Sequence, residues 1–259
     1  MQYAPELFTY IKIYVDEHQH PGDFWLTGSQ IFRLMQGVQE SLAGRVALLH
    51  MSPLSQREII SAPAAPFIPE FERLLDTSRD IAPVTTPELF HRLWLGSMPG
   101  LASGQFSDRN IFYSSYISTY IERDVRDLSG NVDALKFHRF ITAVAARTAQ
   151  LLNYNALAED ADIDLPTAKS WIHILETLGI VFLLHPYSNN VLKRTIKTPK
   201  VYFYDTGLVC YLTRWSSPEV AECGAMNGAL LENYTVSEIM KSYQNAGLEP
   251  YIYFYRDRD

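Results

Sequence analysis

The chain has 259 residues and is 47% hydrophobic, which is enough for one large domain or two to three small ones and argues against disorder. Its net charge of −7 at pH 7 argues against a broad electropositive surface for nucleic acid but leaves room for a local basic site. The two cysteines, Cys210 and Cys223, have no metal-ligand spacing, so neither a zinc cage nor a disulfide framework is expected.

The first 54 residues alternate between helical and strand patterns. Apolar residues at helical spacing predict a helix over 6–16, and a second helix is expected over 30–44. Two apolar runs, 23–29 and 45–54, read as buried strands. Helix, strand, helix and strand in this order predict part of an α/β sheet of parallel strands.

The middle of the chain changes character twice. Five prolines between 61 and 87 predict a connection or a mobile insertion rather than a packed element. Residues 107–129 then place apolar side chains near one face of a long helix, and residues 133–153 continue as a second amphipathic helix.

Residues 153–205 carry the clearest local motif. A short helix over 153–163 is followed by Asp164 as an N-cap, Pro166 in the first turn, and a second helix that Gly179 ends. Two strands joined by a turn at 188–190 come next. This pattern predicts a helix-turn-helix completed by a hairpin, which is a winged helix.

The last part predicts one more amphipathic helix over 228–247 and an alternating strand over 251–259. No basic and apolar leader opens the chain, and no apolar run approaches the ~20 residues that span a bilayer. A cytoplasmic protein without a membrane partner is therefore predicted.

Several stretches of the chain, in the right order, resemble the prokaryotic AAA-like ATP-binding proteins that carry a C-terminal domain of unknown function. They include QYAPELF, FWLTGSQIFRLMQGVQESLAGRVALL, YISTYIERDVRDLS, PTAKSWIHILETLGIVFLL, KTPKVYFYDTGLVCYL and GALLENYTVSEI. The resemblance implies a multidomain fold of α/β and α+β parts: a partial P-loop ATPase core, a winged helix and a partial PD-(D/E)xK restriction-nuclease-like domain. The corresponding boundaries are 1–60 for the core, 61–140 for a linker and helical lid, 141–205 for the winged helix and 206–259 for the nuclease-like domain.

The resemblance also marks what these residues do not contain. No Gly-x-x-x-x-Gly-Lys-Ser/Thr phosphate loop occurs in the 259 residues, and in relatives the acidic Walker B pair directly precedes the segment that resembles QYAPELF. The chain is therefore expected to be truncated at both ends. ATP and Mg²⁺ are expected as cofactors of complete family members, with none bound by this chain.

Three residues of the ATPase part resemble nucleotide-facing positions. Thr27 and Ser29 match a polar sensor for the γ-phosphate, or else they end a strand and cap the next helix. Arg45 resembles an arginine that faces the nucleotide, or else it compensates a helix dipole. Without a phosphate loop the structural interpretations are favoured.

Glu232 resembles the early acidic position of the nuclease-like fold. A single carboxylate cannot hold a catalytic Mg²⁺, which needs several oxygen ligands in near-octahedral geometry. Two other carboxylates have structural interpretations: Asp205 as the cap of a following helix, and Asp124 as the ion-pair partner of Arg123.

Two roles remain open for the winged helix. A DNA-binding role would use Lys169 and His173, with Thr167 and Ser170, on the second helix, and would use the wing cations Lys193, Arg194, Lys197 and Lys200 for phosphate contacts. Glu159, Asp160 and Asp162 on the first helix oppose this role by repelling phosphates. The alternative is packing between domains, with the wing against acidic surfaces of the ATPase core.

The leading functional hypothesis is a fragment of an AAA-like ATP-binding protein without independent ATPase activity. One alternative is a winged-helix DNA-binding module. Another is a piece of a full-length ATP-hydrolysing switch protein whose gene boundary is misplaced. DNA through the winged helix and self-association through exposed sheet edges are the predicted partners.

Overall fold

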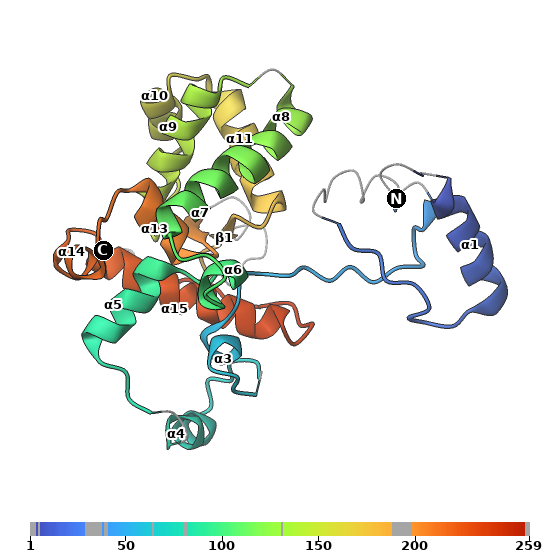
Figure 1. Ribbon diagram of the computed structural model, residues 1–259, viewed down its shortest axis with the longest axis horizontal. Coiled ribbons are helices and arrows are strands. Elements are labelled where there is room, and N and C mark those ends of the chain that lie inside the picture. Colours follow the sequence, from blue (N-terminus) through green and yellow to red (C-terminus); the bar gives the residue numbers. More distant parts are fainter. Residues whose placement is uncertain are drawn as a thin grey trace. The chain divides into compact units, whose positions relative to one another are not determined.

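The computed structural model describes residues 4, 6–28, 38, 41–63, 65–79, 82–130, 132–187 and 198–256. The chain divides into two compact units, Met1–Leu49 and His50–Asp259 (Figure 1). The domain boundaries at 60, 140 and 205 that the sequence suggests stay predictions.

The first unit contains helix α1, Leu7–His18, which confirms the helix predicted over 6–16. Phe8 on α1 packs with Val38 and Leu42 in a small apolar cluster that also takes in Ile11 and Leu26. Most of the helix predicted over 30–44 lies outside the described residues.

The strands predicted over 23–29 and 45–54 are not found. Residues 24–28 and 46–55 belong to no helix or strand. A parallel strand obtains its backbone hydrogen bonds from neighbouring strands, and no such neighbour lies in the described part of residues 1–49. These two runs have the apolar composition of buried strands, but within the described part of residues 1–49 they have no partner strand.

The second unit is mainly helical (Figure 1). Its helices are α3 Gln56–Ile59, α4 Phe71–Arg79, α5 Thr86–Leu95, α6 Pro99–Ala102, α7 Arg109–Tyr116, α8 Glu122–Ser129, α9 Ala134–Ala145, α10 Tyr154–Ala161, α11 Leu165–Thr177, α13 Thr206–Leu212, α14 Pro218–Cys223 and α15 Asn227–Gln244. The π-helix η1, Ile117–Ile121, joins α7 to α8, so the helix predicted over 107–129 is confirmed.

The proline-rich connection over 61–87 contains α4, which begins two residues after Pro69 and whose residues 71–76 are exposed, in line with a segment that is not a packed element. One prediction in the middle of the chain needs correction. The helix expected over 133–153 ends at Ala145. Beyond it, the N–H groups of Ala149 and Leu152 donate to Val201 and Pro199 instead of continuing the helix.

The local signals of the helix pair are confirmed. Asp164 accepts a hydrogen bond from the backbone N–H of Thr167, which caps α11. Gly179, at φ +67°, closes the other end: its N–H donates to Glu176, and the N–H of Ile180 donates to Leu175. These two bonds are the Schellman pattern, which favours glycine at the left-handed position.

Strands β1, Val181–Leu184, and β2, Lys200–Phe203, form an antiparallel pair in which Phe182 faces Tyr202. The backbone at 149–152 lies along the other edge of β2, where Leu151 bridges Lys200. The turn of the predicted hairpin, with residues 188–197, lies outside the described residues.

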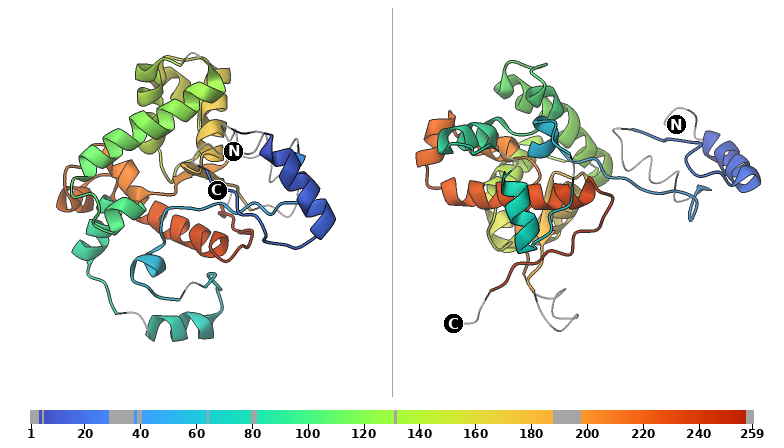
Figure 2. Two further views of the ribbon diagram at one scale, coloured as in Figure 1. Left: turned by 45° about the vertical axis from the view of Figure 1, so that its right-hand side comes forward. Right: turned by 90° about the horizontal axis from the view of Figure 1, so that it is seen from below.

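Helix α15 packs against one face of this small sheet. It runs across the unit, drawn in red (Figure 2). Met240 of α15 packs with Phe182, Leu184, Tyr202 and Tyr204 in one cluster. On the other side of the unit's core, Trp171 of α11 makes edge contacts with Phe137 and Phe140 of α9. The small sheet thus contacts α15 through β2 and α11 through β1.

The strand predicted over 251–259 is reduced to one bridge. Phe254 pairs with Pro186 in a parallel bridge, with hydrogen bonds to His185 and Tyr187, and residues 251–253 and 255–256 belong to no strand. One bridge fixes too few backbone groups to define a strand, so this expectation is wrong for the described residues.

Candidate functional site

The nucleotide-facing residues of the first unit do not form one site. Arg45 binds Asp16 through two hydrogen bonds, from Nε to Oδ1 and from Nη2 to Oδ2 at 3.1 Å. The bond from Arg45 lowers the pKa of the Asp16 carboxyl. Thr27 is exposed and outside any helix or strand, and Ser29 lies outside the described residues.

Helix α11 presents a polar face to solvent. Lys169, Ser170 and His173 are exposed, and Thr167 is half-buried. The opposite face is buried through Ala168, Trp171, Ile172, Ile174 and Leu175. The residues predicted for DNA contact on this helix are thus accessible together.

A shallow cavity of about 500 Å³ lies at the start of α10 and α11, lined by residues that include Asn153, Tyr154, Lys169 and Thr198. The ammonium of Lys169 lies 5.9 Å from the centre of the Tyr154 ring. Lys169 therefore stands beside the first turn of α10, where the helix dipole is positive and the N–H of Ala156 is already capped by the Asn153 side chain.

Two of the three acids on α10 and its end are paired with cations. Arg147 Nη2 lies 2.5 Å from Asp160 Oδ2, and Lys136 Nζ lies 2.8 Å from Asp162 Oδ2. The bond from Lys136 lowers the pKa of Asp162. The repulsion that these acids would exert on a phosphate is therefore weaker than their number in the sequence indicates.

Lys200 and Glu232, predicted for two separate sites, contact one another. Lys200 Nζ lies 2.7 Å from Glu232 Oε1, which also accepts a hydrogen bond from the Tyr202 hydroxyl at 2.7 Å. Burial and Glu232 raise the pKa of Tyr202. Lys200 thus faces α15, and Lys193, Arg194 and Lys197 lie outside the described residues.

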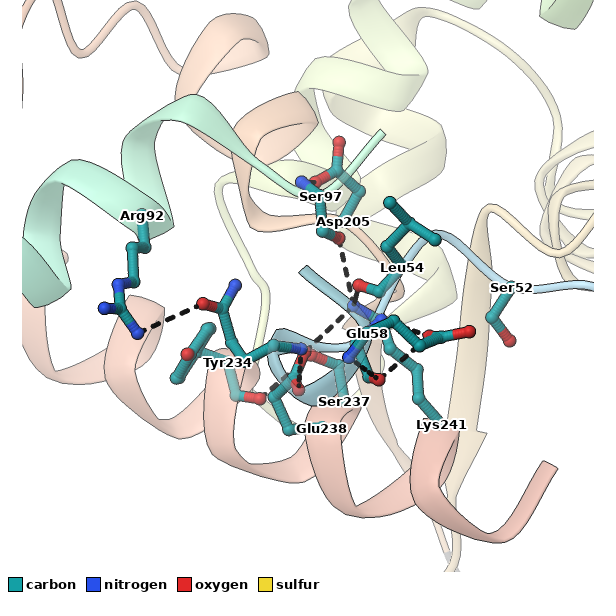
Figure 3. Close-up of polar contacts among 12 residues, drawn as sticks. Ser52, Leu54, Glu58, Arg92, Ser97, Asp205, Tyr234, Ser237, Glu238 and Lys241 are labelled. Carbon is teal, nitrogen blue, oxygen red and sulfur yellow. Dashed lines mark hydrogen bonds and ion pairs between the residues drawn. The ribbon is translucent and has the colours of Figure 1, made fainter. Parts of the chain in front are cut away.

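A buried polar cluster, which sequence reasoning missed, surrounds Lys241 (Figure 3). Its side chain is 2% exposed, and its ammonium donates to Leu54 O at 3.1 Å, Ser97 Oγ at 3.0 Å and Glu238 Oε1 at 3.1 Å. All three ammonium protons therefore have acceptors. The only sequence signal was Glu238 three residues before Lys241, which is ordinary helical spacing.

A second buried group adjoins this cluster through Ser97. Asp205 caps α13, as predicted, and accepts hydrogen bonds from Ser97 N at 2.9 Å and from the Tyr113 hydroxyl at 2.6 Å. Burial and Asp205 raise the pKa of Tyr113 well above its ordinary value. Lys241, Ser97 and Asp205 are buried and Glu238 is 21% exposed, so these groups mainly hold backbone segments together.

The close approach at Asp205 depends on glycine. A Cβ at Gly207 would lie 2.6 Å from both Gly96 Cα and Leu95 O. Arg109, also buried, donates to Gly207 O at 3.0 Å and stacks over the Trp94 ring at 4.1 Å. Segments 94–97, 109–113 and 205–207 thus meet where any larger residue would separate them.

The described residues also bear on whether the chain has metal sites, reactive cysteines or membrane-spanning helices. No group of three or more histidines, cysteines or acids within the described ranges is arranged to hold a metal ion. Burial raises the pKa of the Cys210 thiol to about 12, which leaves it protonated and unreactive at neutral pH. Over the same ranges, every helix is too short or too polar to cross a bilayer.

Two family profiles match the chain: an AAA domain over residues 1–60 and a domain of unknown function, DUF8612, over residues 86–219. The first agrees with an AAA-like relationship for the first unit. The PD-(D/E)xK-like and winged-helix assignments stay predictions.

The curated relatives are themselves uncharacterized. The uncharacterized protein Rv2008c of Mycobacterium tuberculosis is 28% identical over 240 residues, which are 92% of this chain and 48% of the relative. The uncharacterized protein Mb2031c of Mycobacterium bovis matches with the same figures, so the chain spans about half the length of the curated relatives it matches. No solved structure matches. Because its profile covers more than half of the residues, the chain belongs to the DUF8612 family, preceded by an AAA-like region.

Proposed function

We propose that this chain is a portion of an AAA-like ATP-binding protein and that it does not hydrolyse ATP by itself. The AAA domain match over residues 1–60 supports the relationship to ATPases. The observation that carries the second part is the pairing of Arg45 with Asp16: the guanidinium that would face a phosphate already binds a carboxylate in the described structure.

The residues present do not fit a triphosphate. A phosphate loop supplies backbone N–H groups and a lysine to the β- and γ-phosphates, and the 259 residues contain no such motif. ATP and Mg²⁺ are accordingly assigned to complete AAA-like proteins, and no chemical step is assigned to this chain.

Phosphate release from magnesium-ATP by the purified chain tests this proposal. We expect the rate of the buffer alone, both for the unaltered chain and for Arg45→Ala. Robust turnover that Arg45→Ala abolishes would show that the chain has its own catalytic site and would overturn the proposal.

A second candidate function is DNA binding through the winged helix predicted over residues 141–205, with α9, which begins at Ala134, as its first helix. The element order supports it: α9, an edge segment at 149–152, α10, α11, β1 and β2 is the order of helices and strands in a winged helix. The exposed face of Lys169, Ser170 and His173 on α11 would enter the major groove.

The charge arrangement favours a small interface. Lys200 is paired with Glu232, so phosphate contacts would come from Lys169 and from the wing cations Lys193, Arg194 and Lys197. Pairing of Asp160 and Asp162 removes part of the opposing charge.

Fluorescence anisotropy with a labelled duplex, measured over a series of salt concentrations, tests DNA binding. Each lost phosphate contact lowers the slope of log K against log salt by about 1, so Lys169→Gln should weaken binding and flatten the slope by that amount. Lys12→Gln, the same charge change on exposed α1, is the matched control and should have no effect. Absence of binding at low salt, or equal losses in both variants, would remove this candidate.

A further inference from the structure

Residues 52–59, which we call the strap, are held along α15 by alternate residues. Figure 3 labels Ser52, Leu54 and Glu58 of this segment. Ser52 Oγ donates to Gln244 Oε1 at 2.6 Å, and Leu54 O accepts from Lys241 Nζ at 3.1 Å. Gln56 N donates to Glu238 Oε2 at 2.8 Å, and Glu58 Oε2 accepts from Asn245 Nδ2 at 2.8 Å. Four strap residues thus bind four residues of the last helix and its end.

The other side of the strap is bound as well. The N–H of Leu54 donates to Ser97 O at 2.9 Å, and Arg92 Nη1 donates to Gln56 Oε1 at 3.3 Å. The strap therefore lies between α15 and the end of α5. The strap falls in the last ten residues of the region that matches the AAA domain, residues 1–60.

Polar contacts hold the strap, with little apolar burial. None of the residues of α3 is buried. A cavity of about 560 Å³ remains between the strap, α4 and α15, with Ser55 and Arg57 on one wall and Ile239 and Ser242 on another. A segment fixed in this way opens locally at lower free energy than one fixed by a core.

The ammonium of Lys241 keeps hydrogen-bond partners whether the strap is bound to α15 or released from it. On release of the strap its ammonium loses Leu54 O but keeps Ser97 Oγ and Glu238 Oε1. The buried charge therefore stays paired in either state, and release does not leave an isolated cation in the interior.

Helix α15 is in turn fixed to strand β2. Asn233 accepts from Phe203 N at 2.8 Å and donates to Phe203 O at 2.9 Å, as a neighbouring strand would. Glu232 binds Lys200 and Tyr202 on the same strand. A displacement of α15 is thus transmitted to the sheet that lies beside α11.

We propose that the strap is a releasable link through which changes in the AAA-like region reach α15 and, through Asn233 and Glu232, the β1–β2 sheet. This role rests on the AAA-like relationship in the proposed function. The strap would exist in two states, bound to α15 and free, and the first unit would shift the equilibrium between them.

Limited trypsin digestion of the full chain tests the strap, because Arg57 lies within it and Arg45 lies before it. In the unaltered chain, cleavage after Arg45 should be fast and cleavage after Arg57 slow. Gln56→Pro removes the N–H that binds Glu238, at the first helical position of α3, where proline is tolerated. We expect cleavage after Arg57 to accelerate roughly two- to tenfold, the effect of losing one hydrogen bond.

Gln56→Ala is the matched control, since it keeps the N–H and removes only the weaker contact with Arg92. Rates are normalised to those of synthetic 52–62 peptides with the same substitutions, which corrects for the sequence preference of trypsin. Hydrogen exchange at Phe203 in Gln56→Pro gives the second readout, and faster exchange than in Gln56→Ala is expected.

Equal cleavage after Arg45 and Arg57 in the unaltered chain would show that the strap is not held. Unchanged exchange at Phe203 in Gln56→Pro would show that strap and sheet are uncoupled. Either result overturns the inference without affecting the phosphate-release result. Conversely, ATP turnover by the chain overturns the proposed function and leaves the trypsin pattern intact.

Discussion

The two units differ in how far their apolar residues are covered. In residues 1–49, Trp25 is 79% exposed and Leu49 is 71% exposed, and the described core is Phe8, Val38 and Leu42. In residues 50–259, aromatic and aliphatic side chains such as Phe137, Phe140 and Ile121 are fully buried. The fold is therefore specified most firmly within the second unit, which contains the DUF8612 match.

The same contrast holds for charged groups. Arg45 and Asp16 form an exposed pair in the first unit, where water competes for both partners. Lys241 in the second unit is buried among three acceptors. Removing a buried partner leaves the other charge without compensation, whereas removing an exposed one does not.

Lys241→Met should have the largest effect of the substitutions considered. It leaves Glu238 without its cation and Leu54 O and Ser97 Oγ without their donor, so we expect unfolding of the second unit to become easier by roughly 3–5 kcal/mol. Urea unfolding followed by circular dichroism measures this. Lys136→Met, at a surface pair, should barely move the midpoint, and equal shifts in the two variants would contradict the contrast.

Gly207→Ala should rank second. The added methyl would lie 2.2 Å from the Tyr113 hydroxyl and 2.6 Å from Gly96 Cα, so two segments must separate, at about 1–3 kcal/mol. Gly228→Ala, in α15, meets nothing within 4 Å and should stabilise the helix by roughly 0.5–1 kcal/mol. Thermal melts of the two variants should therefore shift in opposite directions; shifts of the same sign would rule out the close approach at Gly207.

Arg45→Ala should leave the unfolding midpoint of the whole chain unchanged. Both partners of its ion pair are solvent-exposed, and their contact closes no core. The same urea titration provides the measurement. A clear loss of stability would mean that the first unit depends on this pair and would weaken the contrast between the units.

The smallest effect concerns pH. Hydrogen bonds from Thr167 lower the pKa of Asp164 below its ordinary value of 3.8. Because the pKa is lower in the folded chain, Asp164 stabilises α11 above about pH 3.8 and loses this contribution as the pH falls through the folded pKa. Asp164→Asn keeps a good N-cap and removes the titration, so its stability should vary less with pH in this window. Carboxyl NMR titration gives the pKa directly; a value at or above 3.8 would refute the cap.

Local signals in the sequence were sufficient for several elements. Asp164, Pro166 and Gly179 each act within a few residues, so the bounds of α11 and the cap of α13 at Asp205 follow from nearest-neighbour chemistry. The antiparallel pairing was equally readable, because β1 and β2 are short apolar runs that lie close in sequence.

The remainder depends on contacts between distant residues. Lys241 lies 187 residues from Leu54 and 144 from Ser97, so no window of sequence reveals why a lysine is buried on α15. Similarly, Lys200 was predicted to contact DNA and Glu232 to belong to a nuclease-like site, but in the structure the two side chains form an ion pair with each other. The apolar runs 24–28 and 46–50 read as strands because composition shows suitability for a sheet without showing the partner strand.

Residue-resolved hydrogen exchange along the whole chain tests the central claim most directly, namely that the strap belongs to the second unit although it falls within the AAA domain match. The amides of Leu54 and Gln56, bound to Ser97 and Glu238, should exchange far more slowly than those of residues 46–50. Exchange of Leu54 and Gln56 at the rate of residues 46–50 would contradict the account.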